Sequence, residues 1–96
     1  MKTNEPAKLG DAFLRLLAAR GDEAGYYRAR TKLVWEELFG VHVAQHTRDL
    51  RVRDGKLYIY LTNAPLRHQM LMVREGVRER LNEAFGGGYF TEVIVK

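Results

Sequence analysis

KLYIYLTNAPLRHQMLMVR, residues 56–74, is the stretch that decides the fold. Its first seven residues alternate between aliphatic side chains and lysine, tyrosine or threonine, which predicts a half-buried strand over Lys56–Thr62. Pro65 ends this strand, because proline has no N–H for a sheet and its fixed φ suits the first turn of a helix. Thr62, Asn63 or Ala64 is expected to cap that helix, and Asn63 is preferred, since its side chain can accept a hydrogen bond from a backbone N–H of the first turn.

From Leu66 onward the apolar period becomes helical, which predicts the longest helix of the chain. Its apolar stripe is expected to comprise Leu66, Met70, Val73, Val77, Leu81 and Phe85. Gly76 lies inside this helix and is compatible with a kink or a division into two helices. Three glycines at residues 86–88 end it.

Two helices are predicted before this stretch. Residues 1–7 are expected to be disordered, because nothing apolar holds them down. A helix follows over Lys8–Arg20, with an apolar face of Leu9, Ala12, Phe13, Leu16 and Leu17 and with Gly21 as its C-cap. After a polar connector over residues 21–25, a second helix is expected from Tyr26 to Phe39, where Gly40 interrupts it. Residues 41–45 are predicted as a further helical turn or a bend.

A β-hairpin is predicted ahead of the proline corner. Thr47–Arg53 alternates, with Leu50 and Val52 on one side, and Asp54-Gly55 is a strong two-residue turn signal that pairs this segment antiparallel with the next strand. Tyr89–Val95 is expected to be the last strand, with Thr91, Val93 and Val95 toward the helices. The predicted class is α+β in the order α-α-β-β-α-β, with a three-stranded sheet and helices on one face.

The composition is that of one small domain. The chain has 96 residues, no cysteine and no apolar run near the length of a membrane span, and its N-terminus has no apolar signal region. We therefore expect a cytoplasmic protein without a membrane partner. The formal net charge is +4, and 11 of the 16 cations are arginine, which suits phosphate and carboxylate partners.

The sequence offers no catalytic set, and we expect neither an enzyme nor a cofactor. The three histidines include His42 and His46, whose spacing places two imidazoles on one helix face as in some zinc sites. The glutamate of zinc proteases and a third ligand are both missing, so no metal site is predicted. His46 is expected to cap or pack ahead of the first strand.

The solvent side of the hairpin is the most informative surface. Arg51 and Arg53 are predicted to lie near Tyr58 and Tyr60, where cations and aromatic rings suit phosphates and stacked bases. Two other interpretations stay open, namely cross-strand packing that merely solubilises the sheet, and a partner or homodimer surface to which Phe90 and Ile94 contribute. The candidate nucleic-acid-binding residues are Arg51, Arg53, Tyr58 and Tyr60, with Arg28, Arg30, Lys32, Arg74 and Arg78 as a basic surround.

A succession of short segments resembles the DciA family. They are VWEELFG at 34–40, VAQHT at 43–47, DGKLYI at 54–59, APLRHQM at 64–70 and LNE at 81–83 before a glycine turn. The match runs from about Leu9 to Val95, so residues 8–96 are expected to form one DciA-like domain, similar to the short members of Bacteroidetes type.

This resemblance implies a KH-like α+β domain with a role in chromosome replication. Members of the family associate with the replicative helicase, help to load it on DNA, and bind DNA themselves. Longer members carry a disordered tail beside the domain, and no catalytic motif is implied. Trp35 and Arg67 occupy family-like positions, and their spacing predicts architectural roles first: Trp35 as a core anchor, and Arg67 as a first-turn residue that pairs with an acid or reaches a ligand.

Overall fold

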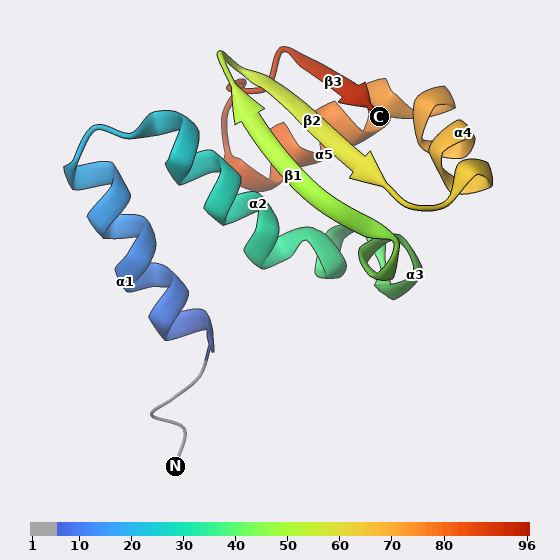
Figure 1. The fold of residues 1–96 in the computed structure, drawn as a ribbon. Helices are drawn as coiled ribbons and strands as arrows, with labels where there is room; N and C mark the ends of the chain where they lie inside the picture. Colours follow the sequence, from blue (N-terminus) through green and yellow to red (C-terminus); the bar gives the residue numbers. More distant parts are fainter. Residues whose placement is uncertain (1–5) are drawn as a thin grey trace.

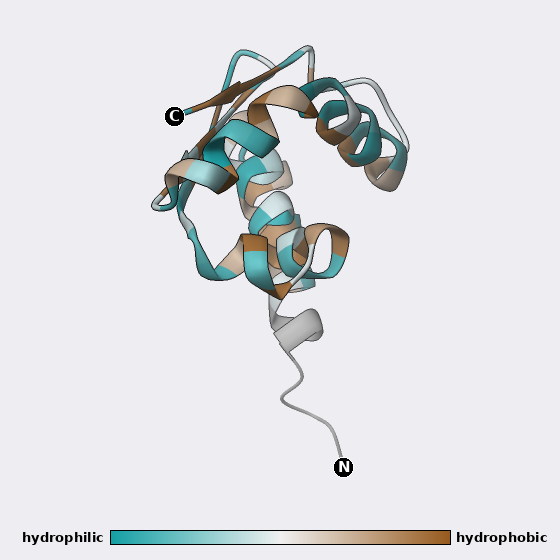
Figure 2. Cartoon of the chain, turned by 90° about the vertical axis from the view of Figure 1, so that its right-hand side faces the viewer, coloured by the Kyte–Doolittle hydropathy of each residue, from teal (hydrophilic) through white to brown (hydrophobic). Residues whose placement is uncertain are grey.

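The computed structural model describes residues 6–96, and the side chains from residue 10 onward. Its elements are α1 (Pro6–Ala19), α2 (Glu23–Phe39), α3 (Val41–Gln45), β1 (Thr47–Arg53), β2 (Lys56–Leu61), α4 (Ala64–Met72), α5 (Arg74–Phe85) and β3 (Glu92–Val95). The strands form one sheet in the order β1-β2-β3, in which β2 pairs antiparallel with β1 and parallel with β3 (Figure 1). The predicted α+β class is confirmed. The side view in Figure 2 shows the helices grouped on one side of the strands.

The predicted hairpin is confirmed, including its turn. Asp54 and Gly55 both have positive φ, of 53° and 79°, which matches the right-handed twist of the two strands that they join. Leu50 lies opposite Ile59 and Val52 lies opposite Leu57, so the aliphatic residues of both strands share the helix side of the sheet.

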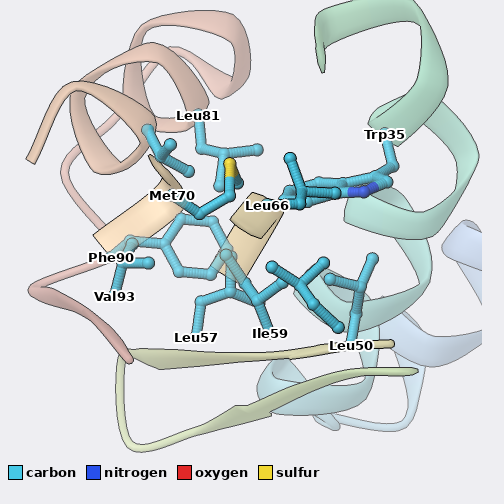
Figure 3. Packing of buried hydrophobic residues seen from close by; sticks show 11 residues of the cluster. Trp35, Leu50, Leu57, Ile59, Leu66, Met70, Leu81, Phe90 and Val93 are labelled. Atoms are coloured by element: carbon cyan, nitrogen blue, oxygen red, sulfur yellow. The ribbon is translucent and has the colours of Figure 1, made fainter. Parts of the chain in front are cut away.

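The hydrophobic core lies between this side of the sheet and helices α2, α4 and α5. Leu57 and Ile59 of β2 and Leu81 of α5 have no exposed surface, and Trp35 of α2 closes the cluster beside Leu66 (Figure 3). Trp35 is 3% exposed, which confirms the predicted core anchor. Its Nε1 donates a hydrogen bond to the Thr47 Oγ1 at 2.9 Å, so the buried indole N–H is satisfied.

The proline corner forms as predicted. The side chain of Asn63 accepts a hydrogen bond from the Leu66 N–H at 2.9 Å and caps α4. The helix after it does divide, but at Val73 rather than at Gly76, which lies inside α5. Because the chain changes direction at Val73, this side chain leaves the predicted apolar stripe and is 54% exposed. The remaining residues of that stripe are buried or half-buried.

Helix α2 begins earlier than predicted. It starts at Glu23 because the Asp22 side chain accepts a hydrogen bond from the Gly25 N–H and caps it, while Glu23 places a negative charge in the first turn. After Gly40, residues 41–45 form the short helix α3, and His46 is its C-cap, as predicted. The segment predicted as a polar connector, residues 21–25, therefore includes the start of α2.

The predicted apolar face of α1 does not reach the core. Figure 1 shows α1 separated from the sheet by α2, against which it packs. From residue 10 onward, the buried residues of α1 are Gly10 and Leu17, and a Cβ on Gly10 would lie only 2.7 Å from the Leu33 Cδ1 of α2. Phe13 and Leu16 are each 51% exposed, because the sheet and the other helices close the core without α1. Ala12 is exposed as well, and the Leu9 side chain lies outside the described part. Gly21, the predicted C-cap, follows the helix with a positive φ of 73°.

Helix α1 starts at Pro6, two residues before the predicted start. Residues 6–7 of the segment predicted to be disordered belong to α1, and its other residues, 1–5, fall outside the described part of the chain. Within residues 6–96, no helix has the length and apolarity that a membrane crossing requires.

The last strand is shorter than predicted, and Phe90 does not lie on the open side of the sheet. Phe90 is 1% exposed and its ring points into the core (Figure 3). The strand begins only at Glu92, so its alternation does not extend back to Phe90. The Asn82 side chain hydrogen-bonds to both the N–H and the carbonyl of Phe90 at 2.9 Å and turns the ring inward. Thr91, which was predicted to face the helices, is exposed.

A candidate nucleic-acid interface

The side of the sheet opposite the helices, here called the open face, carries rows of residues across its strands. The register aligns Arg51, Tyr58 and Ile94 in one row and Arg53, Lys56 and Glu92 in another. Lys96 follows β3, and its backbone hydrogen-bonds to β2 on both sides of Tyr60. The predicted juxtaposition of Arg51 and Arg53 with the two tyrosines is confirmed.

A β-bulge in β1 adds a residue that alternation did not predict. Thr47 pairs with Leu61 and Asp49 pairs with Tyr60, so the partner strand has no residue opposite Arg48. Thr47 accordingly faces inward to Trp35, while the Arg48 guanidinium lies 5.9 Å from the centre of the Tyr60 ring. No sequence signal marks this bulge.

Arg51 is held in place by two neighbours. Its guanidinium lies 5.4 Å from the centre of the Tyr60 ring, and its Nε donates to the Asp49 Oδ2 at 2.9 Å. This hydrogen bond lowers the pKa of Asp49 and raises the pKa of Arg51, so both groups are charged at neutral pH. The Tyr60 ring is therefore flanked by Arg48 and Arg51.

A groove runs from the open face over the edge strand β1 to α2. We call it the basic groove, and its lining comprises Arg28, Arg51, Val52, Arg53, Tyr58, Tyr60 and Lys96. In the described part of the chain this lining has four cationic side chains and no acidic side chain. The structure thus brings together five of the nine predicted residues and adds Lys96, whose side chain joins them only because β3 pairs with β2.

The other four predicted cations do not line the basic groove. Arg30 lies 4.3 Å from the centre of the Phe85 ring and donates to the Tyr26 hydroxyl, which gives it a packing role between α2 and α5. Lys32 lies 3.5 Å from Asp49, at the rim of the open face. Arg74 bonds the Leu71 carbonyl and Arg78 pairs with Glu75, both at the α4–α5 corner.

Three further residues that the sequence singles out make a backbone hydrogen bond or a ring contact. Arg67 donates to the Leu61 carbonyl at 3.3 Å, so its guanidinium holds the corner between β2 and α4 rather than an acid. The His42 and His46 rings do lie together, with centroids 5.0 Å apart. Within residues 6–96 they belong to no cluster of three or more metal-ligating side chains.

Comparison with known proteins identifies the family. The model described as Dna[CI] antecedent, DciA, matches residues 8–95, which is nearly the whole chain. The chain belongs to the DciA family. DciA domains are associated with loading of the replicative helicase in DNA replication.

A UPF0232 protein of Corynebacterium glutamicum (strain R) is similar to this DciA domain. The two are 31% identical over 61 residues, which cover 64% of this chain and 34% of the relative. The chain thus spans about a third of the length of the relative that it matches. No solved structure gives a significant match.

Proposed function

We propose that this DciA domain is a non-enzymatic, DNA-associated adaptor of chromosome replication in the cytoplasm, which binds DNA through the basic groove. The observation that carries the proposal is the gathering of Arg28, Arg51, Arg53 and Lys96 around Tyr58 and Tyr60. Residues from α2, from two strands and from the segment after β3 converge there.

The chemistry of the basic groove suits a nucleic-acid backbone and its bases. Arginine guanidinium groups donate paired hydrogen bonds to phosphate oxygens, and exposed aromatic rings offer stacking surfaces to unpaired bases. Tyr58 and Tyr60 are half-buried, so each side chain packs on the sheet and keeps part of its surface accessible. Single-stranded DNA is the form that uses both features.

The corner between α4 and α5 supports the assignment of DNA contact to the sheet. KH domains clamp the nucleic-acid backbone with a GXXG loop, which joins two helices. The matching corner here, between α4 and α5, holds Val73-Arg74-Glu75-Gly76 and lacks the first glycine. A KH-like relationship therefore remains a prediction of topology, and we assign DNA contact to the open face instead.

The replicative helicase is proposed as the second partner on the basis of family membership. Homodimerisation through the open face is less favoured, because Phe90 belongs to the core and only Ile94 remains of the apolar residues expected there.

Fluorescence anisotropy with single-stranded and duplex DNA at two salt concentrations tests the proposal. We expect affinity to fall steeply with salt, with a slope of about −0.7 per phosphate contact on single strands. Replacing Arg51 and Arg53 by glutamine removes two contacts and should flatten that slope by about 1.4.

Arg74→Gln with Arg78→Gln is the matched control, because it removes the same charge from the α4–α5 corner. If both double variants weaken binding equally, the effect is one of net charge and the basic groove is not the site. No binding by the unmodified chain at low salt refutes DNA contact by this domain.

A further inference from the structure

Asp49 is an acidic side chain at the rim of the basic groove. Its Oδ2 accepts a hydrogen bond from the Arg51 Nε at 2.9 Å, and its Oδ1 lies 3.5 Å from the Lys32 Nζ. The carboxylate therefore pairs with Arg51, which lines the basic groove, and with Lys32, which lies at the rim of the open face. It belongs to the same strand as Arg51 and Arg53, where the sequence shows only an alternating charged face.

The position of this carboxylate is set by the backbone. The bulge at Arg48 places Asp49 opposite Tyr60, and the Asp49 Oδ1 accepts a 2.8 Å hydrogen bond from the Leu50 N–H. Asp49 in turn keeps the Arg51 guanidinium over the Tyr60 ring, at 5.4 Å from its centre. The carboxylate thus neutralises Arg51 and also keeps one side of Tyr60 covered.

We propose that Asp49 competes with nucleic-acid phosphate for the Arg51 guanidinium. When DNA binds in the basic groove, a phosphate replaces the Asp49 carboxylate on Arg51. The inference rests on the proposed function. A carboxylate and a phosphate present similar acceptor oxygens to a guanidinium, so one replaces the other without a change in the donor. Phosphate on Arg51 would draw the guanidinium off Tyr60 and expose the ring to a base.

The competition makes the affinity depend on how many phosphates the ligand offers. An isolated phosphate on Arg51 gains no more than the interaction that the Asp49 carboxylate already makes with this guanidinium. A nucleic-acid strand adds contacts with Arg28, Arg53 and Lys96 and so displaces the carboxylate. Asp49 is then an affinity- and selectivity-determining residue of the groove. The lowered pKa of Asp49 keeps the competitor charged throughout the neutral range.

The test is the DNA titration repeated with Asp49→Asn. Asparagine keeps the oxygen that accepts from Leu50 but loses the charge, so we expect the same fold and roughly two- to fivefold tighter binding of single-stranded DNA. Asp54→Asn is the matched control, since it removes the same charge from the hairpin turn and asparagine tolerates a φ of 53°. We expect a clearly smaller effect from this control.

A second comparison places Asp49→Asn in an Arg51→Gln background. The gain in DNA affinity should disappear there, because Arg51, the cation for which Asp49 and phosphate compete, is gone. On the unmodified chain, the NMR resonance of the Arg51 Nε–H should shift when single-stranded DNA is added. Equal gains from the two aspartate variants, a gain that survives without Arg51, or an unmoved Arg51 resonance would each overturn the inference. If the chain binds no DNA at all, the proposed function fails first. Binding that depends on Arg51 but not on Asp49 refutes the competitor alone.

Discussion

Gly55 lies in the hairpin turn that joins β1 to β2, with a φ of 79° that other residues rarely adopt. A Cβ at this position would lie 3.1 Å from the carbonyl oxygen of Tyr89, and the Gly55 carbonyl accepts a 2.8 Å hydrogen bond from the Thr91 N–H. The turn is therefore also the point where the chain leading into β3 is attached.

We predict that Gly55→Ala lowers the free energy of unfolding by about 1–3 kcal/mol, from the strained φ and the close carbonyl. Gly76→Ala is the matched control. Gly76 lies inside α5 with open space around it, so alanine there should stabilise by about 0.5–1 kcal/mol. Urea denaturation measures both. Equal effects of the two substitutions would contradict this account of Gly55.

Tyr89 gives the fold a dependence on alkaline pH. Its ring stacks on Tyr27 with centroids 3.8 Å apart, and burial raises the pKa of its hydroxyl above the ordinary value of 10.0. The folded state therefore favours the neutral phenol. The stability from this group is complete below pH 10.0 and is lost as the pH rises through the raised pKa.

We expect Tyr89→Phe to remove this part of the alkaline destabilisation, because phenylalanine keeps the stacked ring without an ionisable hydroxyl. Denaturation midpoints measured from neutral pH to above 10.0 should fall for the unmodified chain and fall less for the variant. Parallel pH profiles of the two proteins would show that Tyr89 does not titrate abnormally.

At the scale of elements, α1 is the helix whose amphipathic pattern is least satisfied. It packs on α2 through Leu17, which belongs to no part of the cluster around Trp35 and Phe90. The sheet with α2, α4 and α5 encloses that cluster by itself. The pattern on α1 therefore predicts the helix correctly, although it does not predict what the helix packs against.

A chain that begins at Gly21 should consequently keep a cooperative fold. We expect it to lose about 1.5–3 kcal/mol, which is what burial of one leucine contributes. By comparison, Leu81→Ala at a fully buried position should cost about 2–5 kcal/mol. Thermal unfolding and the near-ultraviolet circular dichroism of Trp35 report on both. A truncated chain without a cooperative transition would show that α1 is part of the core.

At the scale of the whole molecule, the interface is assembled from segments that are distant in sequence. Arg28 comes from α2, Arg51 and Arg53 from β1, the tyrosines from β2, and Lys96 from the end of the chain. Residue type and local alternation predict nine cations and tyrosines for this interface. Only those on the hairpin, together with Arg28, meet in the basic groove.

The sequence by itself determined the hairpin and the type of most elements, because these depend on contacts between neighbours. Period-2 alternation, Asp54-Gly55 and the cap at Asn63 specify structure within a few residues. The hairpin face with Arg51 beside Tyr58 follows from them, as strand pairing through a two-residue turn leaves one register.

Only the tertiary structure decided the rest. The bulge that turns Arg48 outward, the inward rotation of Phe90 by Asn82, and the arrival of Lys96 beside Tyr60 each depend on a partner far along the chain or on the pairing of whole strands. The exposed face of α1 has the same cause, because hydrophobic periodicity states that a face is apolar but not which surface is left to cover it.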